Sequence, residues 1–189
     1  RTFFERWHFG ILAAAVLALG ACEGVEQTLP SGTASVVGAA VDVPFDFSAA
    51  RSTALYETLA DGTTRVDLNL CEKGCALYGN QVDPGSRAVL INLRVPTANL
   101  LPASLFTPAT GVVAMAVLGV GEPDPLQEGF VSEIEMAVSG QVRIDTLALS
   151  PGGAIRGTFD LQFEHGGALA GSFDAPLLLL QDGAPVVTP

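Results

Sequence analysis

A strict alternation of apolar and polar residues in residues 154–175 constrains the fold of this chain more than any other feature. Phe159 and Phe163 fall on the apolar side of the first run, and Phe173 falls on the apolar side of the second run, which follows a Gly-Gly turn. A period of two is typical of β-strands with one buried and one solvated face, as in antiparallel sheets. Because a shift in pairing by one residue would turn these phenylalanines to water, the pattern also fixes the register. We therefore expect an antiparallel hairpin here.

Most of the remaining chain shows the same alternation, interrupted by turn residues such as Asp61-Gly62. The stretch Ala49–Leu59 also fits a short helix, and both interpretations stay open. The content of glycine (21) and proline (12) agrees with short strands joined by turns. The sequence predicts an all-β fold of about 8–10 strands, either an antiparallel β-sandwich or a small β-barrel. The expected strands are 34–43, 53–59, 65–71, 88–95, 112–120, 130–138, 141–149, 154–164 and 168–175.

Two segments depart from simple alternation. Residues 96–108 contain three prolines, so we expect a long loop that crosses between sheets rather than a central strand. Residues 112–120 (VVAMAVLGV) are apolar on both faces. This pattern favours a central core strand, with the wall of an apolar pocket as the alternative.

The N-terminal region carries Arg1 and Arg6 ahead of an apolar run, Phe9–Ala21. This run is shorter than the roughly 17–25 residues that span a bilayer, and it is typical of a secretory signal peptide. It ends in Leu19-Gly20-Ala21-Cys22, which resembles the lipobox of bacterial lipoproteins. In that family a peptidase cuts before the cysteine once the sulfur carries a diacylglycerol. The resemblance implies a lipid anchor at Cys22 and a place in the bacterial cell envelope, in the outer membrane.

The lipobox resemblance also implies how the chain is divided. Residues 1–21 form the signal peptide, and residues 22–33 form the lipidated cysteine with a polar tether. Residues 34–180 form the β domain, and residues 181–189 form a flexible tail.

Three cysteines are an odd number for an exported protein. With Cys22 assigned to the lipid, Cys71 and Cys75 remain as a pair in an oxidising compartment. We expect a disulfide between them, because Gly74 permits the tight backbone that so short a loop needs. A zinc site and a redox pair are the alternatives. Zinc needs about four ligands, and redox pairs usually have two residues between the cysteines rather than three.

A second resemblance covers residues 139–176. The sequences SGQVRIDTLA, GTFDLQF and LAGSFDAP contain a Gly-x-Val strand, a Gly-x-Phe-Asp strand and a Leu-x-Gly-x-Phe-Asp-Ala-Pro strand. This order is similar to the C-terminal region of uncharacterised β-rich envelope lipoproteins of bacteria. Members of that group often have a cysteine after the final proline, where this chain has Leu177. The resemblance implies a fold and no activity. We attribute the repeated Gly-x-Phe-Asp to the pairing of two strands.

The charge and the polar residues exclude several function classes. A net charge of −11 with a single lysine excludes a nucleic-acid-binding role. His165 lies beside a glycine turn, where histidines are usually solvated, and no catalytic serine motif is present. Glu133 and Glu135 share one strand face, which we interpret as a hydrated outer face.

Calcium ligation is a weaker hypothesis. Asp42 and Asp46 lie close in sequence, and the acidic loop 122–128 also offers oxygen ligands. Residues 61–67 have an arginine where an EF-hand needs a ligand. The sequence therefore predicts no catalytic residue, no metal site and no cofactor.

The leading functional hypothesis is a lipid-anchored envelope protein whose β domain has a structural or protein-interaction role. Its expected partners are the membrane, through Cys22, and another envelope protein. The alternative is a small β-barrel that carries an apolar ligand or acts as a chaperone, and an enzyme ranks third. A ligand cavity of roughly 300–1,000 Å³ would favour the carrier. An exposed apolar patch would favour a partner protein.

Overall fold

The computed structural model describes residues 30–49, 51–73, 82, 85–123, 130–150, 152–181 and 184–186. Within these residues the chain is all-β, as the alternation predicted, and two single-turn 3₁₀ helices lie in one loop. No helix among them is long and apolar enough to cross a membrane. The elements are β1 (Thr33–Ala40), β2 (Val43–Pro44), β3 (Phe47–Ala49), β4 (Arg51–Thr58), β5 (Thr63–Cys71), β6 (Arg87–Pro96), η1 (Thr97–Asn99), β7 (Leu105–Phe106), η2 (Pro108–Thr110), β8 (Val112–Pro123), β9 (Phe130–Leu147), β10 (Ala154–Phe163), β11 (Ala168–Gln181) and β12 (Ala184–Val186).

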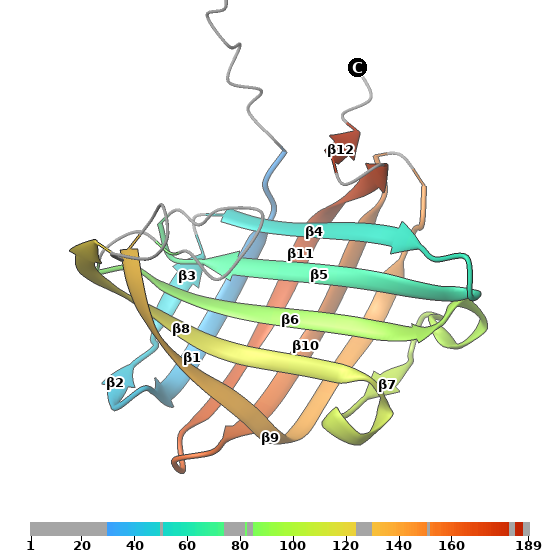
Figure 1. The fold of residues 1–189 in the computed structure, drawn as a ribbon. Helices are drawn as coiled ribbons and strands as arrows, with labels where there is room; N and C mark the ends of the chain where they lie inside the picture. The colour runs from blue at the N-terminus through green and yellow to red at the C-terminus, as the bar shows by residue number, and fades with distance from the viewer. Residues whose placement is uncertain are drawn as a thin grey trace, which may run out of the picture.

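Seven of these strands close into a barrel (Figure 1). The order is β10-β9-β8-β6-β5-β4-β11, and the pairing of β10 with β11 completes the ring. Neighbouring strands are antiparallel except at one seam, where Leu177–Leu179 of β11 runs parallel to Ala54–Tyr56 of β4. The fold is therefore the barrel of the two predicted architectures, with β1, β2, β3, β7 and β12 added to it.

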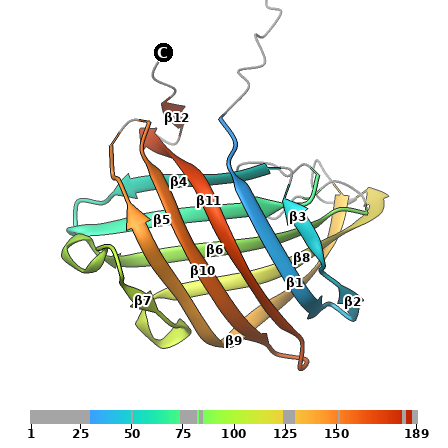
Figure 2. The same ribbon diagram turned by 180° about the vertical axis from the view of Figure 1, so that it is seen from behind.

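Two long strands, β9 and β11, each belong to both walls of the barrel. We call β4, β5, β6, β8 and the N-terminal half of β9 the front wall, and β10, β1 and the adjoining parts of β9 and β11 the back wall. The strands of the two walls cross each other (Figures 1 and 2). β1 pairs with β11 outside the closed ring, and the short strands β2 and β3 fold back on β1.

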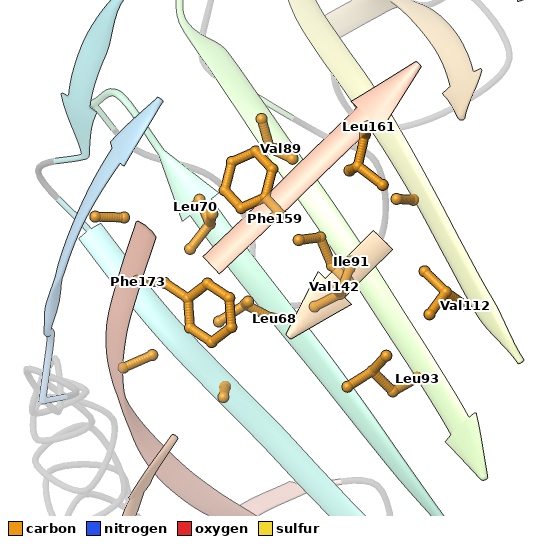
Figure 3. Packing of buried hydrophobic residues seen from close by; sticks show 14 of the residues in the cluster. Leu68, Leu70, Val89, Ile91, Leu93, Val112, Val142, Phe159, Leu161 and Phe173 are labelled. Carbon is orange, nitrogen blue, oxygen red and sulfur yellow. The ribbon is translucent and has the colours of Figure 1, made fainter. Parts of the chain in front are cut away.

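The interior of the barrel is filled by side chains from both walls. Leu68, Ile91, Ile144 and Leu161 point toward the centre and are each at most 1% exposed. Figure 3 shows how side chains from β5, β6, β8, β9, β10 and β11 meet there. A cavity large enough for a ligand would leave its lining side chains with accessible surface. The near-zero exposure of these residues therefore indicates a packed interior, as is usual in small barrels.

The predicted hairpin is confirmed in its register and its buried face. Phe159 pairs with Gly171, and Phe173 pairs with Gly157. A Cβ on Gly171 would lie 2.6 Å from the Phe159 ring, and a Cβ on Gly157 would lie 2.7 Å from the Phe173 ring. Each phenylalanine thus lies over a glycine of the other strand. This packing explains the repeated Gly-x-Phe-Asp as a consequence of strand pairing.

Several predicted boundaries are wrong. The two strands expected at 130–138 and 141–149 are one strand, β9, which ends at Leu147. Gly140 (φ 106°) makes no turn and stays paired with Leu161 of β10, and a glycine is needed there because a Cβ would lie 2.1 Å from the Asp160 carbonyl oxygen. The helix considered for Ala49–Leu59 is absent, since β4 occupies Arg51–Thr58.

The two segments expected to be irregular also contain strands. The loop 96–108 includes β7, which pairs with β9. Beyond residue 181, β12 pairs with the end of β11, so strand pairing extends into the segment that we expected to be a tail.

Candidate interaction surface

The predicted site residues are only partly within the described part of the chain. Cys22 and Cys75 lie outside it, so the lipid anchor and the disulfide remain predictions. Cys71 is the last residue of β5 and is completely buried on the outer side of the front wall. The outer side of the front wall is therefore buried at this point.

The outer side of β6, β8 and β9 is apolar where these three strands lie side by side. Strand pairing aligns Leu90, Met115 and Met136 in one row across the three strands, and Ala88, Val117 and Ile134 in the next row. Two residues farther along their strands lie Val113 and Val138. We call these eight residues the apolar patch.

Part of the apolar patch is covered and part of it is open. Val82, from the connection between β5 and β6, packs with Ala88, Leu90 and Val117, and all of them are at most 9% exposed. The opposite corner is exposed: Ile134 is 41% exposed, Val113 46% and Val138 54%. Large apolar side chains gathered on an open sheet face are typical of contact surfaces.

The apolar patch revises the interpretation of residues 112–120. We expected a core strand or a pocket wall, because both faces are apolar. In the structure Val112 and Ala114 face the packed interior, whereas Val113 and Met115 face outward and are exposed or half-buried. The second apolar face therefore covers no pocket and belongs to the outer surface.

An open pocket of about 300 Å³ adjoins the patch at Ile134. Its wall is β9 on one side and the turn between β1 and β2 on the other, with the turn between β10 and β11 at its end. The residues that line it are Val41, Asp42, Glu133, Ile134, Glu135 and His165.

Glu135 is the side chain of this pocket that is held in place by hydrogen bonds to both of its carboxylate oxygens. Its side chain is only 4% exposed. The prediction that Glu133 and Glu135 lie on a hydrated outer face is therefore wrong. Both side chains point to the inner side of β9, where Glu135 is buried and Glu133 is exposed. One Glu135 oxygen accepts a hydrogen bond from the Val41 N–H at 2.6 Å, and the other accepts one from the His165 N–H at 2.8 Å. A buried carboxylate held in this way joins three distant segments.

The turn that Glu135 holds is strained. Val41 and Asp42 both have positive φ (51° and 55°), as in a two-residue hairpin turn of type I′. This conformation is unfavourable for a β-branched residue such as Val41. Because the Glu135 carboxylate accepts the Val41 N–H, it stabilises the turn.

His165 lies where the sequence placed it, in the turn between β10 and β11. Its side chain is 79% exposed, and Nδ1 is 3.5 Å from Glu135 Oε1. The lining residues include no hydroxyl, thiol or amine that could act as a nucleophile. Of the three carboxylates in the pocket, that of Glu135 is engaged in structural hydrogen bonds, and those of Asp42 and Glu133 are exposed.

A second polar cluster, centred on Arg87, was not predicted. Its guanidinium donates to both oxygens of Glu72, at 2.8 and 2.6 Å, and to the Pro44 carbonyl at 2.6 Å. It also lies 5.6 Å from the centre of the Phe47 ring. The hydrogen bond from Arg87 lowers the pKa of the Glu72 carboxyl. The cluster fixes the end of β5 and the β2–β3 ribbon to the start of β6.

The acidic residues considered for calcium are not gathered into one site. Asp42 lines the pocket, and the loop 122–128 lies largely outside the described residues. Asp46 accepts the Gly38 N–H, and Asp61 accepts the Thr63 N–H in the turn before β5. This hydrogen bonding with Thr63 lowers the pKa of the Asp61 carboxyl. Asp67 forms an ion pair with Arg65. In the described ranges no group of three histidine, cysteine or carboxylate side chains could hold a metal ion.

Comparisons with known proteins assign no family to this chain. The chain matches no protein-family model, no curated protein and no solved structure. The apolar patch and the pocket beside it are therefore the features from which a function must be argued.

Proposed function

We propose that this protein is a lipid-anchored envelope lipoprotein whose β-barrel binds another protein through its outer surface. The apolar patch on β6, β8 and β9 is the observation that carries this proposal. Its open corner places three large apolar side chains in water, although the inward sides of the same strands already supply a packed core. Exposed apolar surface of this kind favours association with a partner.

The place of the anchor is compatible with this role. The predicted lipid site, Cys22, precedes β1, which belongs to the back wall. The apolar patch lies on the front wall. A tether of about ten residues from Cys22 reaches at most about 35 Å, so the barrel would stay near the membrane with its patch directed away from the tethered strand.

The filled interior favours this role over that of an apolar-ligand carrier. Leu68, Ile91, Ile144 and Leu161 leave no accessible surface for a ligand inside the barrel. The pocket of about 300 Å³ lies outside the core, and three of its six lining residues are carboxylates, which disfavours a wholly apolar ligand. An enzyme is also less well supported, because Glu135 is engaged by two backbone N–H groups.

Native mass spectrometry of a Cys22→Ser protein, secreted behind a conventional cleavable signal peptide in place of residues 1–21, separates a binding surface from a carrier. We expect the mass under native conditions to equal the mass under denaturing conditions. A small molecule that is lost on denaturation would support the carrier and contradict the proposal.

Membrane fractionation tests the anchor in the same variant. We expect Cys22→Ser to move the protein from the membrane fraction to the soluble fraction, because the acyl chains provide the attachment. Retention in the membrane would show that the lipobox interpretation is wrong.

The proposed disulfide between Cys71 and Cys75 can be tested at the same time. The Cys22→Ser protein should react with an alkylating reagent only after reduction. Alkylation of either cysteine without a reductant would contradict the disulfide.

A further inference from the structure

The N-terminal half of β9 has a strand on one side only among the residues that the structure describes. Phe130–Met136 pairs with β8, whereas pairing with β10 begins at Ala137. β10 ends at Phe163, and the chain then turns back into β11. In the described part of the chain, the other side of this half of β9 is therefore an open sheet edge, and it lies beside the pocket.

Hydrogen bonding identifies which backbone groups face that edge. The Met136 carbonyl accepts the Glu164 N–H, so the backbone of Met136 faces away from β8. In an antiparallel strand alternate residues face the same side. The N–H and C=O groups of Ile134 and Ser132 therefore also face away from β8. Ile134 lines the pocket, which places its backbone groups toward the open space.

The charge around this edge is negative. Asp42 and Glu133 are both exposed and line the pocket on opposite sides, and no lysine or arginine lines it. The whole chain has a net charge of −11. An incoming strand with basic side chains would neutralise these carboxylates, whereas a second copy of this acidic chain would add like charge.

We infer that the open edge of β9 accepts an extended segment of a partner protein as an additional strand, and that this segment carries a lysine or arginine beside Asp42 and Glu133. Backbone hydrogen bonds to Ile134 and Ser132 supply the pairing, and the carboxylates select the basic side chain. The inference deepens the proposed interaction role and rests on it. The edge is continuous with the apolar patch through Ile134, so one partner can contact both.

Short peptides test the inference directly on the secreted Cys22→Ser protein. The probe is a fluorescent hexapeptide of alternating threonine and lysine, and its binding is followed by fluorescence anisotropy. We expect it to bind, and we expect binding to weaken by about tenfold when alternate amides are N-methylated, because a methylated amide cannot donate to the edge. Equal binding of both peptides would overturn strand addition.

A pair of matched variants tests whether the carboxylates of the pocket are needed for binding the lysine peptide. The double variant Asp42→Asn, Glu133→Gln should weaken binding of the lysine peptide by about fivefold or more. Asp160→Asn, which removes an exposed carboxylate from the back wall, should leave binding unchanged. A glutamate peptide that binds as tightly as the lysine peptide would overturn the basic partner.

One further variant separates the edge from a dimer interface. Ile134→Pro removes the N–H that faces the open side while keeping the hydrogen bonds of β9 to β8, as edge strands tolerate. We expect Ile134→Pro to abolish peptide binding. We also expect both the unchanged protein and the variant to sediment as monomers. A concentration-dependent dimer that Ile134→Pro dissolves would overturn the inference in favour of a second copy. If the peptides fail and a partner still contacts the apolar patch, the proposed function stands without this inference.

Discussion

The two halves of β9 carry different outer surfaces on one strand. Ile134 and Val138 in the N-terminal half are apolar and exposed, whereas Gln141, Arg143 and Asp145 in the C-terminal half are polar and exposed. The inward sides of both halves face the packed core, through Ala137 in the N-terminal half and through Val142 and Ile144 in the C-terminal half. The inward Glu135 is buried as well, whereas Glu133, nearer the start of the strand, is exposed. The fold therefore requires the inward pattern and leaves the outward residues free to differ.

The same contrast extends over the two walls of the barrel. On the back wall Arg156 forms an ion pair with Asp174 of the next strand, and the Ser35 and Ser172 hydroxyls lie 3.0 Å apart. Such a surface is stable in water without a partner. Val37 is exposed on the back wall (62%), and Arg65 pairs with Asp67 on the front wall. On β8 and β9 of the front wall, however, the exposed outward residues Val113, Ile134 and Val138 are all apolar and belong to one patch. The proposed function accounts for this difference by a contact surface on the front wall.

The largest expected effect concerns the inward side of the back wall. Gly171→Val should destabilise the protein by about 3 kcal/mol or more, because the new side chain would overlap the Phe159 ring and the Ser35 carbonyl. Urea unfolding followed by circular dichroism measures the change. Ala170→Val, on the exposed outer side of the same strand, is the control and should change stability by less than about 0.5 kcal/mol. Equal effects of the two would contradict the described packing.

A smaller effect is expected where the two walls meet at Glu135. Glu135→Gln places an amide where two backbone N–H groups donate, so it should cost about 2 kcal/mol. Glu133→Gln, two residues away and exposed, should be nearly neutral. Thermal or urea unfolding of the pair distinguishes a structural carboxylate from a solvated one. If Glu135→Gln left the free energy of unfolding unchanged, Glu135 would not be the residue that fixes the pocket.

The alternation of residues predicted most of this architecture, and the failures have physical causes. Pairing of β10 with β11 was predictable because both strands alternate strictly. The burial of Glu135 was not predictable, since its partners are backbone N–H groups of turns 94 and 30 residues away in sequence. The break expected near Gly140 is absent because this glycine, despite its positive φ, stays paired with Leu161, and its missing side chain makes room for the Asp160 carbonyl.

The apolar patch was only partly visible in the sequence. The double-sided apolar pattern of 112–120 marked one of its strands, but the pattern alone cannot tell a covered face from an open one. The neighbouring rows from β6 and β9 came together only through the pairing register. The open edge of β9 likewise depends on where β10 ends, which no local pattern gives.

The pH dependence of stability should reveal the Glu72–Arg87 pair on the front wall. The pKa of Glu72 in the folded protein lies below its ordinary value of 4.5, so its contribution is present above that pH and is lost as the pH falls through the folded-state pKa. Glu72→Gln should therefore be about 1 kcal/mol less stable than the unchanged protein at neutral pH. The difference should vanish in strong acid. A difference that is constant with pH would contradict the ionic role of Glu72.

The smallest expected effect is on the apolar patch itself. Val113→Thr keeps the side-chain shape and should change stability by less than about 0.5 kcal/mol, because the residue is half exposed. Val142→Thr, on the inward side of β9, should cost about 1–3 kcal/mol. Similar losses for both variants in urea unfolding would place the patch in the core and remove its role as a contact surface.

Site-specific photocrosslinking in intact cells that produce the protein is the most direct test of whether the front wall binds a partner. A photoreactive residue at Val113 on the front wall is compared with the same residue at Thr158 on the back wall, and both positions are exposed. We expect a discrete crosslinked protein from Val113 and none from Thr158. Equal crosslinking from both positions, or crosslinking from Thr158 alone, would contradict it.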